Sequence, residues 1–412
     1  MAAPSRTKVI IAGAGIAGPI LAIFLKMKGY EPVVYERVDE LADVGLSLCL
    51  QPNGLRVLSL IPGFVERIIG KPLEKIMHHS ILPDESTVLV DSDIPALLPE
   101  RTGFTLTGVR RPVFNRTIVE AAQEHGVEIV FGHQLVDLKE SEDSVEVTFA
   151  NGTKDTASFV VGCDGIHSNT RICLFGKEPV DFTGLIQTGG VSPTPEEFKQ
   201  HPALRNIYAD GAHLICYPIS DTQTSWAITL REPEAKETWR AMDEERQQAF
   251  KNGPFSQWGF GTGGMIHAAD RIIKYGLYDR PELKTWHKGR VVLLGDAAHP
   301  TSPHLGQGAN QAFEDIYYLV LQLTRHNAAA APPSTALLGT IFAAYEAARV
   351  ERTSVLVRGA RKQGENRVVQ GVEACRARDR EVREAWADAD ATLAGYLQLY
   401  GQPWPLDGKS EI

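Results

Sequence analysis

Apolar and polar positions change their period several times within the first forty residues. Residues 8–12 (KVIIA) form a β-branched apolar run. A glycine-rich turn, an apolar stretch that continues to residue 25, and a second β-branched run that ends at Glu36 follow it. Short apolar runs bounded by glycine are typical of strands buried on both faces, and a longer run between them is typical of a crossover helix. This pattern predicts one unit of a parallel α/β sheet.

Residues 9–25 contain no charged residue and therefore imitate a membrane span. Three glycines and Pro19 interrupt the run. Burial between the layers of an α/β fold explains its apolarity without a membrane. We therefore expect a buried strand and helix here, and no membrane span.

The rest of the chain shows strand patterns first and helical patterns later. Residues 144–164 indicate a hairpin that turns at Asn151-Gly152 and whose return strand ends at Asp164. Residues 211–220 and 224–232 alternate like the half-buried strands of a sheet that covers a ligand. Another buried strand at 290–296 precedes a helix, and residues 326–334 (HNAAAAPPS) indicate a linker before a helical C-terminal region.

Composition narrows the class of protein. The chain has 412 residues, of which 43% are hydrophobic and 23% charged, which is ordinary for a soluble globular protein with a large core. A formal net charge of -9 argues against a nucleic-acid-binding surface, which needs clustered Lys and Arg. Five cysteines without a C-x-x-C pair, and an N-terminus without a signal pattern, predict reduced thiols and a cytoplasmic setting.

The glycine turn has the spacing of a phosphate-binding loop. Gly13 permits the tight turn, Gly15 lets main-chain amides approach a pyrophosphate, and Gly18 lets the helix lie close to the strand. The phosphates then lie at the positive end of the helix. Glu36 can accept hydrogen bonds from both ribose hydroxyls and would repel a 2'-phosphate, so the sequence predicts bound FAD or NAD rather than NADP.

A second set of glycines, Gly259, Gly261 and Gly264, has the same spacing. No apolar strand precedes them and no amphipathic helix follows in the sequence pattern, so we expect a loop there.

Residues 289–315 (GRVVLLGDAAHPTSPHLGQGANQAFED) gather acidic and histidine residues and allow three interpretations. A metal site needs Asp296, His299 and His304 to converge, but two prolines break the register, so loop histidines are favoured over ligands. A serine hydrolase needs a G-x-S-x-G motif, which the sequence lacks. The third interpretation is a main-chain cradle, because a glycine-lined helix N-terminus at 306–310 would stabilise an anion on a flat ring.

Three motifs in this order and spacing resemble those of the single-component, class A FAD-dependent aromatic monooxygenases, the p-hydroxybenzoate and salicylate hydroxylase-like family. The motifs are GAGIAG with Glu36, CDGIHSNTR for the family pattern D-G-x-x-S-x-x-R, and GDAAHPTSPHLGQGANQAFED for G-D-A-A-H-x-x-x-P-x-x-G-x-G-x-N. The resemblance covers roughly residues 8 to 360, including YEAARVER after the third motif. Within the second motif, Ser168 and Arg171 have the alternative of only capping a helix and pairing locally.

The resemblance implies a role for each motif. Glu36 would bind the adenosine ribose, Arg111 the ribityl-phosphate region and Asp296 the ribityl chain, while the segment that begins at Pro303 would line the isoalloxazine ring. Asp164 would lie where FAD and the nicotinamide cofactor both approach. The cofactor-binding residues expected in this way are Gly13, Gly15, Ile16, Ala17, Gly18, Glu36, Arg37, Arg111, Asp164, Asp296, Pro303, Gly306, Gln307, Gly308, Ala309 and Asn310.

The resemblance also implies the reaction. NADPH or NADH would dock transiently and reduce FAD, O2 would add to give a C4a-hydroperoxide, and the distal oxygen would pass to an electron-rich carbon of a polycyclic aromatic or enol substrate. The helix N-terminus at 306–309 would favour the anionic reduced flavin. Neither a catalytic acid–base pair nor a metal is expected.

The segment GLIQTGGV, the strand pair after it and LREPEAKETW (residues 230–239) resemble the substrate domain of tetracycline-inactivating monooxygenases. Gln187 matches a drug-facing glutamine of that group and Arg205 lies near its substrate arginine, but the histidine expected near Ser225 is missing. A tetracycline-like drug, as in antibiotic resistance, and an intermediate of secondary metabolism are both open as substrates. The substrate contacts expected are Gln187, Arg205, His213, Tyr217, Trp226, Pro303 and His304.

The fold implied is α/β, with a Rossmann-like FAD-binding domain of the GR2 type that a mostly antiparallel substrate domain interrupts. We expect the FAD domain at 1–76, 102–180 and 277–330, the substrate domain at 77–101 and 181–276, and a C-terminal helical region at 331–412. The chain would be a monomer that acts on a small molecule. The alternatives are a non-oxygenating flavin reductase or dehydrogenase on the same scaffold, and a flavin-bearing binding or redox-sensing module.

Overall fold

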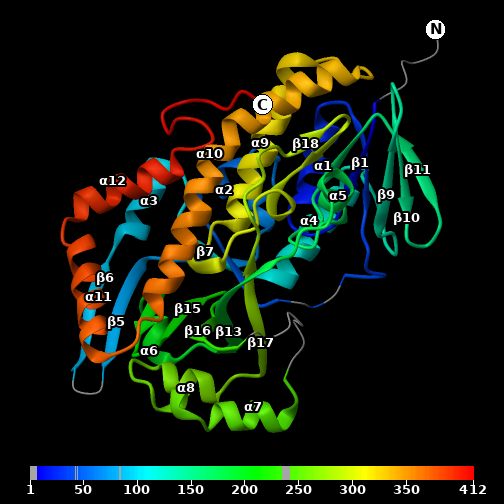
Figure 1. The fold of residues 1–412 in the computed structure, drawn as a ribbon. Coiled ribbons are helices and arrows are strands. Elements are labelled where there is room, and N and C mark those ends of the chain that lie inside the picture. Colours follow the sequence, from blue (N-terminus) through cyan, green and yellow to red (C-terminus); the bar gives the residue numbers. More distant parts are fainter. Residues whose placement is uncertain (1–6, 42, 44, 83–84, 234–241) are drawn as a thin grey trace.

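The strand, helix and strand expected at the N-terminus form the centre of a six-stranded sheet in a computed structural model of the protein (Figure 1). The structure describes residues 7–41, 43, 45–82, 85–233 and 242–412. Neighbouring strands of this sheet are parallel, except that β18 is antiparallel to β19. In sheet order the strands are β18 (His287–Lys288), β19 (Val291–Leu293), β12 (Phe159–Gly162), β1 (Lys8–Ala12), β2 (Glu31–Tyr35) and β8 (Glu128–Val130).

The register of the parallel strands brings their carboxyl ends to one edge. Ala12 at the end of β1 lies opposite both Tyr35 of β2 and Gly162 of β12. Because the carboxyl ends of parallel strands form the usual ligand edge of an α/β sheet, the residues just beyond them are candidates for binding. Those residues include Gly13, Glu36, Asp164 and Asp296.

The apolar run at residues 9–25 lies inside this part of the molecule. It comprises most of β1, the glycine turn and α1 (Ala17–Met27), in which every residue from 17 to 25 is buried. Within the described ranges, no helix combines the length and the apolarity that crossing a bilayer requires.

A seven-stranded sheet carries the alternating strands predicted at 211–220 and 224–232. Each pair of neighbours in it is antiparallel except β14 with β5. The mostly antiparallel sheet expected from the sequence is therefore confirmed. In sheet order the strands are β17 (Arg271–Asp279), β13 (Asp181–Pro193), β16 (Gln223–Arg231), β15 (Ala212–Pro218), β14 (Ala203–Tyr208), β5 (Lys75–Leu82) and β6 (Glu85–Ser92).

The hairpin predicted at Asn151-Gly152 forms, but its return strand was predicted too long. β10 (Val145–Phe149) pairs with β11 (Lys154–Ala157), in a three-stranded antiparallel sheet that β9 (Leu135–Glu140) completes. The apolar residues that follow form β12 of the parallel sheet instead. The two strands differ in burial, because β11 is mainly exposed and β12 is buried throughout.

Helices cover both large sheets, and one further small sheet lies between β3 (Ser47–Leu50), β7 (Thr107–Arg110) and β4 (Gly70–Pro72). Short 3-10 turns occur at Val65–Arg67, Pro254–Gln257, Gly295–Ala297 (η3) and Pro303–Leu305 (η4). Besides α1, the helices are α2 (Pro52–Leu58), α3 (Ile94–Thr102), α4 (Arg111–Glu124), α5 (Asn169–Phe175), α6 (Glu196–Lys199), α7 (Glu244–Lys251), α8 (Thr262–His267), α9 (Gly308–His326), α10 (Thr335–Arg367), α11 (Val372–Ala385) and α12 (Ala389–Tyr400).

The helical C-terminal region that the sequence predicts is present, and its helices contact both large sheets. α9 ends at His326 and α10 begins at Thr335, so the predicted linker lies between them. α10 packs against α9 and η4 near the parallel sheet and continues down to the antiparallel sheet (Figure 1). α11 packs against β5 and β6, and α12 packs against α3.

The second set of glycines is not wholly a loop, which corrects the prediction. Gly261 has φ +73° and precedes α8, a helix of six residues that contains Gly264. The element directly before α8 is the 3-10 turn at Pro254–Gln257 and not a strand, and α8 lies at the far side of the antiparallel sheet (Figure 1), so the expected contrast with the first glycine turn holds. Of the segment 230–239, residues 234–239 lie outside the described residues.

The division into domains stays a proposal. The expected border at 180/181 falls at the start of β13, whereas those at 76/77, 101/102 and 276/277 fall inside β5, α3 and β17. Because a strand or helix belongs to one unit, we propose borders at the ends of these three elements.

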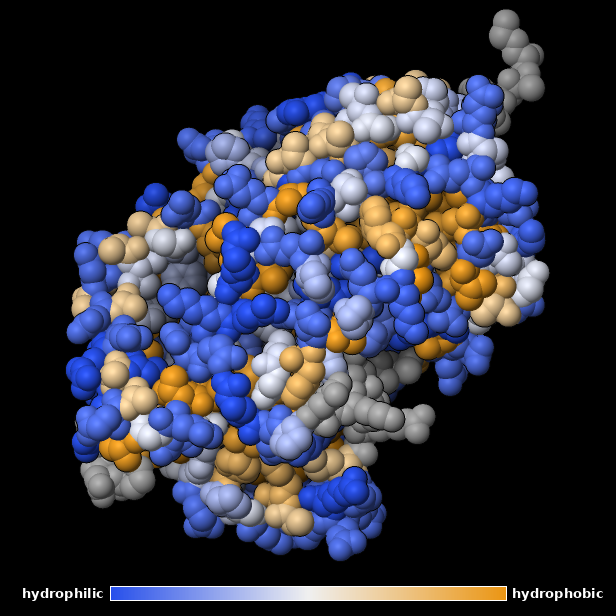
Figure 2. Space-filling model, viewed as in Figure 1, coloured by the Kyte–Doolittle hydropathy of each residue, from blue (hydrophilic) through white to orange (hydrophobic). Residues whose placement is uncertain are grey.

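The surface seen in Figure 2 is mainly hydrophilic, and its apolar residues occur in small groups between polar ones. The large apolar side chains gather inside instead. One core cluster surrounds the parallel sheet and includes Val161, Phe313 and Tyr345. A second cluster lies at the antiparallel sheet around Trp226 and Ile266.

The two glycine sets allow a matched test of packing at their third positions. A Cβ at Gly18 would lie 2.0 Å from the Gly13 carbonyl oxygen, whereas a Cβ at Gly264 would meet no atom within 4 Å. We predict that Gly18→Ala lowers the free energy of unfolding by about 1–3 kcal/mol, since overpacking strains its surroundings. Gly264→Ala should change it by less than about 1 kcal/mol, or raise it, because Ala favours a helix. Thermal unfolding followed by circular dichroism measures both; equal losses would contradict the packing argument.

Candidate active site

A cavity of about 350 Å³ opens where the parallel strands end. The glycine turn, the end of β2, the start of α4 and the segment after β12 form its walls. Ala17 and Gly18 do not line it, because they lie in the first turn of α1. The expected cofactor residues that do line it are Gly13, Gly15, Ile16, Glu36, Arg37, Arg111, Asp164 and Asp296.

The glycine turn leaves room for a ligand at one position and none at another. Gly13 has φ +103°, and a Cβ there would lie 2.6 Å from the Cys163 carbonyl oxygen. At Gly15 a Cβ would meet no atom within 4 Å, and this residue lines the cavity. Gly13 therefore serves the close approach of β1 and β12, and the space beside Gly15 belongs to the cavity.

Glu36 holds the glycine turn and faces the same cavity. One carboxylate oxygen accepts a hydrogen bond from the Ala14 amide at 2.7 Å, and the other accepts one from the Val38 amide at 3.1 Å. The Asn115 side chain donates to the carbonyls of Ala14 and Gly15 from the other side. Sequence reasoning missed Asn115, since an asparagine inside a helix gives no signal of a partner that lies a hundred residues away.

The N-terminus of α1 suits a phosphate. No side chain caps it, and no acidic residue lies in its first turn. The first amides of a helix have no partner within the helix and carry a partial positive charge. A helix end of this kind beside an open cavity accepts an anion, and the pyrophosphate of a dinucleotide fits it.

Asp164 is hydrogen-bonded to residues that follow it in the second motif. Its carboxylate accepts hydrogen bonds from the Ser168 hydroxyl at 2.5 Å and from the amide and hydroxyl of Thr170, each at 2.9 Å, and its burial raises the pKa of the group. Ser168 also caps α5, so it does not act as a cap alone. Arg171 does not pair only locally, because it also donates to the carbonyl of Ala298 in the third motif.

A second cavity of about 480 Å³ lies between the third motif and the antiparallel sheet. Arg111, Ile166 and Asp296 line both cavities, so the two form one continuous groove. Asn310 does not line it, since its side chain is buried against the main chain of β3. The expected flavin-binding residues that line the second cavity are Arg111, Asp296, Pro303, Gly306, Gln307, Gly308 and Ala309.

The third motif exposes Asp296 within a buried stretch and then presents a helix end. Gly295 turns the chain with φ +63°, and Gly306 repeats this conformation just before α9. The cap residue of α9, Gln307, makes no side-chain capping bond, and the first turn has no acidic residue. A second set of helix amides therefore faces the groove, as the cradle interpretation requires.

Gln51 holds this cradle in place, and sequence reasoning missed it. Its amide nitrogen donates to the carbonyls of Leu305 and Gly306 at 3.0 and 3.1 Å, and its amide oxygen accepts from the Gln307 side chain. Its main-chain amide donates to Asn310 at 2.9 Å. The available signal was the polar pair in QPNG, which lies between the apolar residues 48–50 and Leu55.

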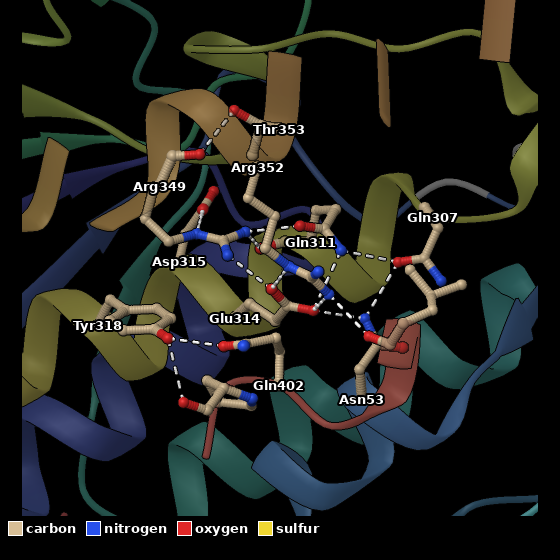
Figure 3. Close-up of polar contacts among 12 residues, drawn as sticks. Asn53, Gln307, Gln311, Glu314, Asp315, Tyr318, Arg349, Arg352, Thr353 and Gln402 are labelled. Atoms are coloured by element: carbon tan, nitrogen blue, oxygen red, sulfur yellow. Dashed lines mark hydrogen bonds and ion pairs between the residues drawn. The ribbon is translucent and has the colours of Figure 1, made fainter. Parts of the chain in front are cut away.

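A buried charge network continues from the cradle into α9 and α10 (Figure 3). Arg349 pairs with both Glu314 and Asp315, and all three side chains are fully buried. Arg352 also pairs with Glu314. Asn53 donates to Glu314 and to the Gln307 side chain, so the network reaches the cap residue of α9.

The histidines of the third motif have separate partners. His299 bonds Asp315 at 2.6 Å through Nε2, whereas His304 accepts a hydrogen bond from Arg367 at 3.1 Å. Burial and Arg367 lower the pKa of His304 to about 3, so this imidazole is neutral. In the part of the chain that the structure describes, no three His, Cys, Asp or Glu side chains form a group that could hold a metal.

Five of the seven expected substrate contacts line the second cavity. These five are Gln187, Tyr217, Trp226, Pro303 and His304. The Gln187 amide is already bonded at both ends, to the Thr229 hydroxyl at 3.1 Å and to the Tyr275 hydroxyl at 2.8 Å. The Tyr217 hydroxyl bonds Ser47 at 2.8 Å.

Arg205 and His213 do not line the cavity, which corrects their expected positions. Arg205 is buried, lies 4.0 Å from the centre of the Phe198 ring and donates to main-chain carbonyls. His213 is fully buried, bonds Asn206, and has a pKa far below its usual value because it is desolvated. The alternation of residues along a strand shows that its two faces differ. It does not show which face contacts a ligand and which packs against a neighbouring layer.

Comparison with known proteins agrees with this geometry. The family described as "FAD binding domain" matches residues 6–360, so the chain belongs to that family. It is 31% identical to the 3-amino-4-hydroxybenzoate 2-monooxygenase PtnB3 of Streptomyces platensis, over 96% of each chain. Together these findings make the protein an FAD-dependent aromatic monooxygenase and confirm FAD as its cofactor.

Solved structures share the whole fold. The chain superposes on Klebsiella pneumoniae HpxO, crystallised with FAD and uric acid, with a TM-score of 0.81 at 24% identity, covering 97% of this chain and 98% of that one. Tetracycline destructase Tet(51) gives a TM-score of 0.62 at 20% identity, covering 95% and 98%. At these identities the two likenesses show the fold alone.

Asp296 offers a direct test of cofactor retention. We predict that Asp296→Ala weakens FAD binding at least about tenfold, because one charge-assisted hydrogen bond contributes about 1.5–3 kcal/mol. Asp221→Ala is the control, since Asp221 lies in an exposed turn and pairs only with Lys71 among the described residues. Ultrafiltration and absorbance at flavin wavelengths measure retained FAD. Equal retention in both variants would exclude Asp296 as a cofactor contact.

The buried network predicts both stability and its pH dependence. Arg349→Met should lower the free energy of unfolding by about 3–5 kcal/mol at neutral pH, because it leaves buried carboxylates unpaired. Burial alone would raise the pKa of Asp315, but His299 and Arg349 lower it from 3.8 to about 2. A carboxyl whose pKa is lower in the folded protein than in the unfolded chain stabilises the fold fully at pH values above its unfolded pKa. This stabilisation is lost as the pH falls toward the folded pKa of about 2.

The difference between the parent and Arg349→Met should therefore stay constant near neutral pH and shrink below about pH 4. Urea unfolding at several pH values measures it. Arg325→Met is the control, since it removes an exposed pair with Glu411 and should cost less than about 1 kcal/mol. A difference that grows as the pH falls would refute the assignment.

Proposed function

We propose that this monooxygenase hydroxylates an electron-rich aromatic or enolic ring in the second cavity, at a carbon that faces the third motif. The observation that carries the proposal is the single groove. It runs from the glycine turn and Glu36, past Asp296, to a cavity under the antiparallel sheet. FAD, when bound, supplies the redox chemistry, in which NADH or NADPH provides two electrons and O2 provides the oxygen atom.

The residues of the first cavity would hold the nucleotide half of the cofactor. Glu36 would accept hydrogen bonds from the ribose, and the open end of α1 would bind the pyrophosphate. Arg111 and Asp296, at the junction of the two cavities, would hold the ribityl region. A side chain with donors and a side chain with acceptors thus lie where a polyol must pass between two enclosed spaces.

The residues of the second cavity would hold the reactive ring. The amides at residues 306–309 would stabilise negative charge that develops on it, since the end of α9 is open toward the groove. Gln51 and Asn310 would keep these amides aimed by fixing the loop that carries them. The walls contributed by Trp226, Leu204 and other apolar residues would exclude water from the reaction.

The substrate would be bound through its shape more than through hydrogen bonds to the sheet. Gln187 and Tyr217, the polar groups expected to face it, already bond other side chains. An apolar wall with satisfied polar groups suits a flat ring. Oxygen transfer to an electron-rich carbon does not require an acid–base pair from the protein. We therefore propose the electron-rich carbon of a phenol, aminophenol or enol as the reacting group.

A tetracycline-like enol is the second candidate. Gln187, the residue that resembles the tetracycline-inactivating enzymes, does line the cavity, and this favours the candidate. Arg205 does not, so the resemblance at the substrate site rests on one residue. A small phenolic ring needs contact with neither Gln187 nor Arg205, and it is therefore the first candidate.

The test is a panel of substrates given to the purified holoenzyme with NADH or NADPH. We predict that 3-amino-4-hydroxybenzoate or a related phenol accelerates NAD(P)H oxidation and yields a product heavier by one oxygen atom, labelled when 18O2 is supplied. Tetracycline and its fused-ring relatives form the second arm. Accelerated oxidation without O2 uptake would favour the reductase alternative, and no acceleration by any ring compound would overturn the proposal.

A further inference from the structure

The last helix of the chain, α12, forms one end of the second cavity. Tyr396, Leu399 and Tyr400 of this helix line the cavity. Residues three and four positions apart lie on one face of a helix, so the three side chains belong to the same face. The helix lies outside residues 6–360, which the family match covers. The family assignment therefore does not describe the cavity wall at this end.

The hydroxyls of Tyr396 and Tyr400 bond no residue of the part of the chain that the structure describes, and neither is among its fully enclosed polar atoms. Tyr400 has only 1% of its surface exposed, yet it lines the cavity. Tyr217 and Tyr275 line the same cavity, but each of their hydroxyls bonds another side chain at 2.8 Å. A buried hydroxyl without a partner costs free energy, so the α12 pair is the place where a ligand gains hydrogen bonds.

The two hydroxyls act as a neutral pair. The ring centroids of Tyr396 and Tyr400 are 5.7 Å apart. Burial raises the pKa of both phenols, so each hydroxyl keeps its proton at neutral pH. Two neighbouring donors suit a carbonyl oxygen, because this atom has two lone pairs.

The walls around the two hydroxyls are apolar. Cys49 and Leu106 belong with Tyr400 to one buried cluster. Leu204 and Leu399 pack against this cluster, and all five residues line the cavity. A hydrogen bond made among apolar walls is stronger than the same bond in water. This end of the cavity therefore suits an apolar part of a molecule that carries one neutral polar group.

Arginine side chains hold α12 at the end that carries the tyrosines. Arg352 donates to the Leu399 carbonyl at 2.8 Å. Arg56 donates to the Tyr400 carbonyl at 2.9 Å. The last carbonyls of a helix have no partner within it, and the two arginines supply the donors. Because Arg352 also pairs with Glu314 in the network of Figure 3, the tyrosines are fixed relative to the cradle at 306–310.

We propose that Tyr396 and Tyr400 determine substrate specificity by binding the oxygen of a neutral acyl group, such as that of a ketone. This inference rests on the proposed function for its ring chemistry. The substrate is then an electron-rich ring that carries an acyl substituent, and the substituent occupies the α12 end of the cavity. Anchoring the substituent there orients the ring and selects the carbon that faces the third motif.

A matched pair of probes tests this contact without turnover. Acetophenone and α-methylstyrene are planar molecules of the same shape, but the first has a carbonyl oxygen where the second has a methylene group. Isothermal titration calorimetry measures the binding of each probe to the holoenzyme. We expect acetophenone to bind at least about fivefold more tightly, because it gains two neutral hydrogen bonds. A smaller ratio, or no measurable binding of acetophenone, would overturn the proposal.

Variants then locate the hydrogen bonds. Tyr396→Phe and Tyr400→Phe remove only the hydroxyls, so each should lose part of the preference for acetophenone. The double variant should prefer α-methylstyrene, because a carbonyl buried without a donor loses its bonds to water. Its affinity for α-methylstyrene should stay within about twofold of the parent value, since apolar contacts are unchanged.

The control is Tyr30→Phe, which removes a hydroxyl that bonds Asn327 outside both cavities. This variant should keep the full preference for acetophenone. Flavin content and melting temperature check that each variant is folded. If the double variant loses its flavin, the two single variants decide. A full preference in the folded α12 variants would refute the assignment.

Activity separates this inference from the proposed function. If 3-hydroxyacetophenone and 3-isopropenylphenol are hydroxylated equally well, the proposed function stands and the acyl subsite fails. If neither is hydroxylated but acetophenone binding still depends on the two hydroxyls, the subsite stands and the choice of phenolic substrates fails. If both predictions hold, the double variant should raise KM for the ketone at least about fivefold, with a smaller change in kcat.

Discussion

The structure depends on one constraint, which is that two helix ends left without side-chain caps face a single groove. α1 and α9 both begin without a capping side chain and without an acidic residue in the first turn. Unpaired amides at such ends need an acceptor, and FAD bound as we propose would provide it. The parallel register of β1, β2 and β12 brings the first end to the groove, and the segment after β19, which contains η3 and η4, brings the second.

The rest of the molecule serves to keep these ends in position. Arg349 with Glu314 and Asp315 fixes α9 against α10, and Asn53 extends this network to Gln307 at the helix end (Figure 3). Gln51 fixes the loop on the other side. Burying these charges costs desolvation free energy. Once the network has formed, however, the loop before α9 has few alternative conformations, so the amides at the helix end keep their orientation.

The sequence predicted the first strand, glycine turn, helix and second strand well because the signals for these elements are local. Gly13, Gly15, Gly18 and Glu36 act within one strand, turn, helix and strand unit, so their spacing carries their geometry. The open end of α9 follows from glycines that are neighbours in the chain. The return strand after Asn151 was predicted too long because the chain passes from one sheet to another between Ala157 and Phe159, and only the pairing of distant strands decides where that happens.

The substrate side could not be predicted in the same way. Arg205 and His213 have the right spacing on alternating strands, but Arg205 lies against Phe198 and His213 is bonded to Asn206, and neither lines the cavity. Contacts such as Gln51 with Gly306 join residues that are 255 positions apart. Contacts of this kind depend on how layers pack, and periodicity does not describe that.

A crystal structure of the protein purified with its flavin tests the central claim most directly. The account predicts the pyrophosphate at the amides of α1 and the flavin ring against residues 306–309, with Asp296 beside the chain that joins them. A flavin held elsewhere, or a groove that remains closed by the protein's own side chains while the holoenzyme is active, would contradict it.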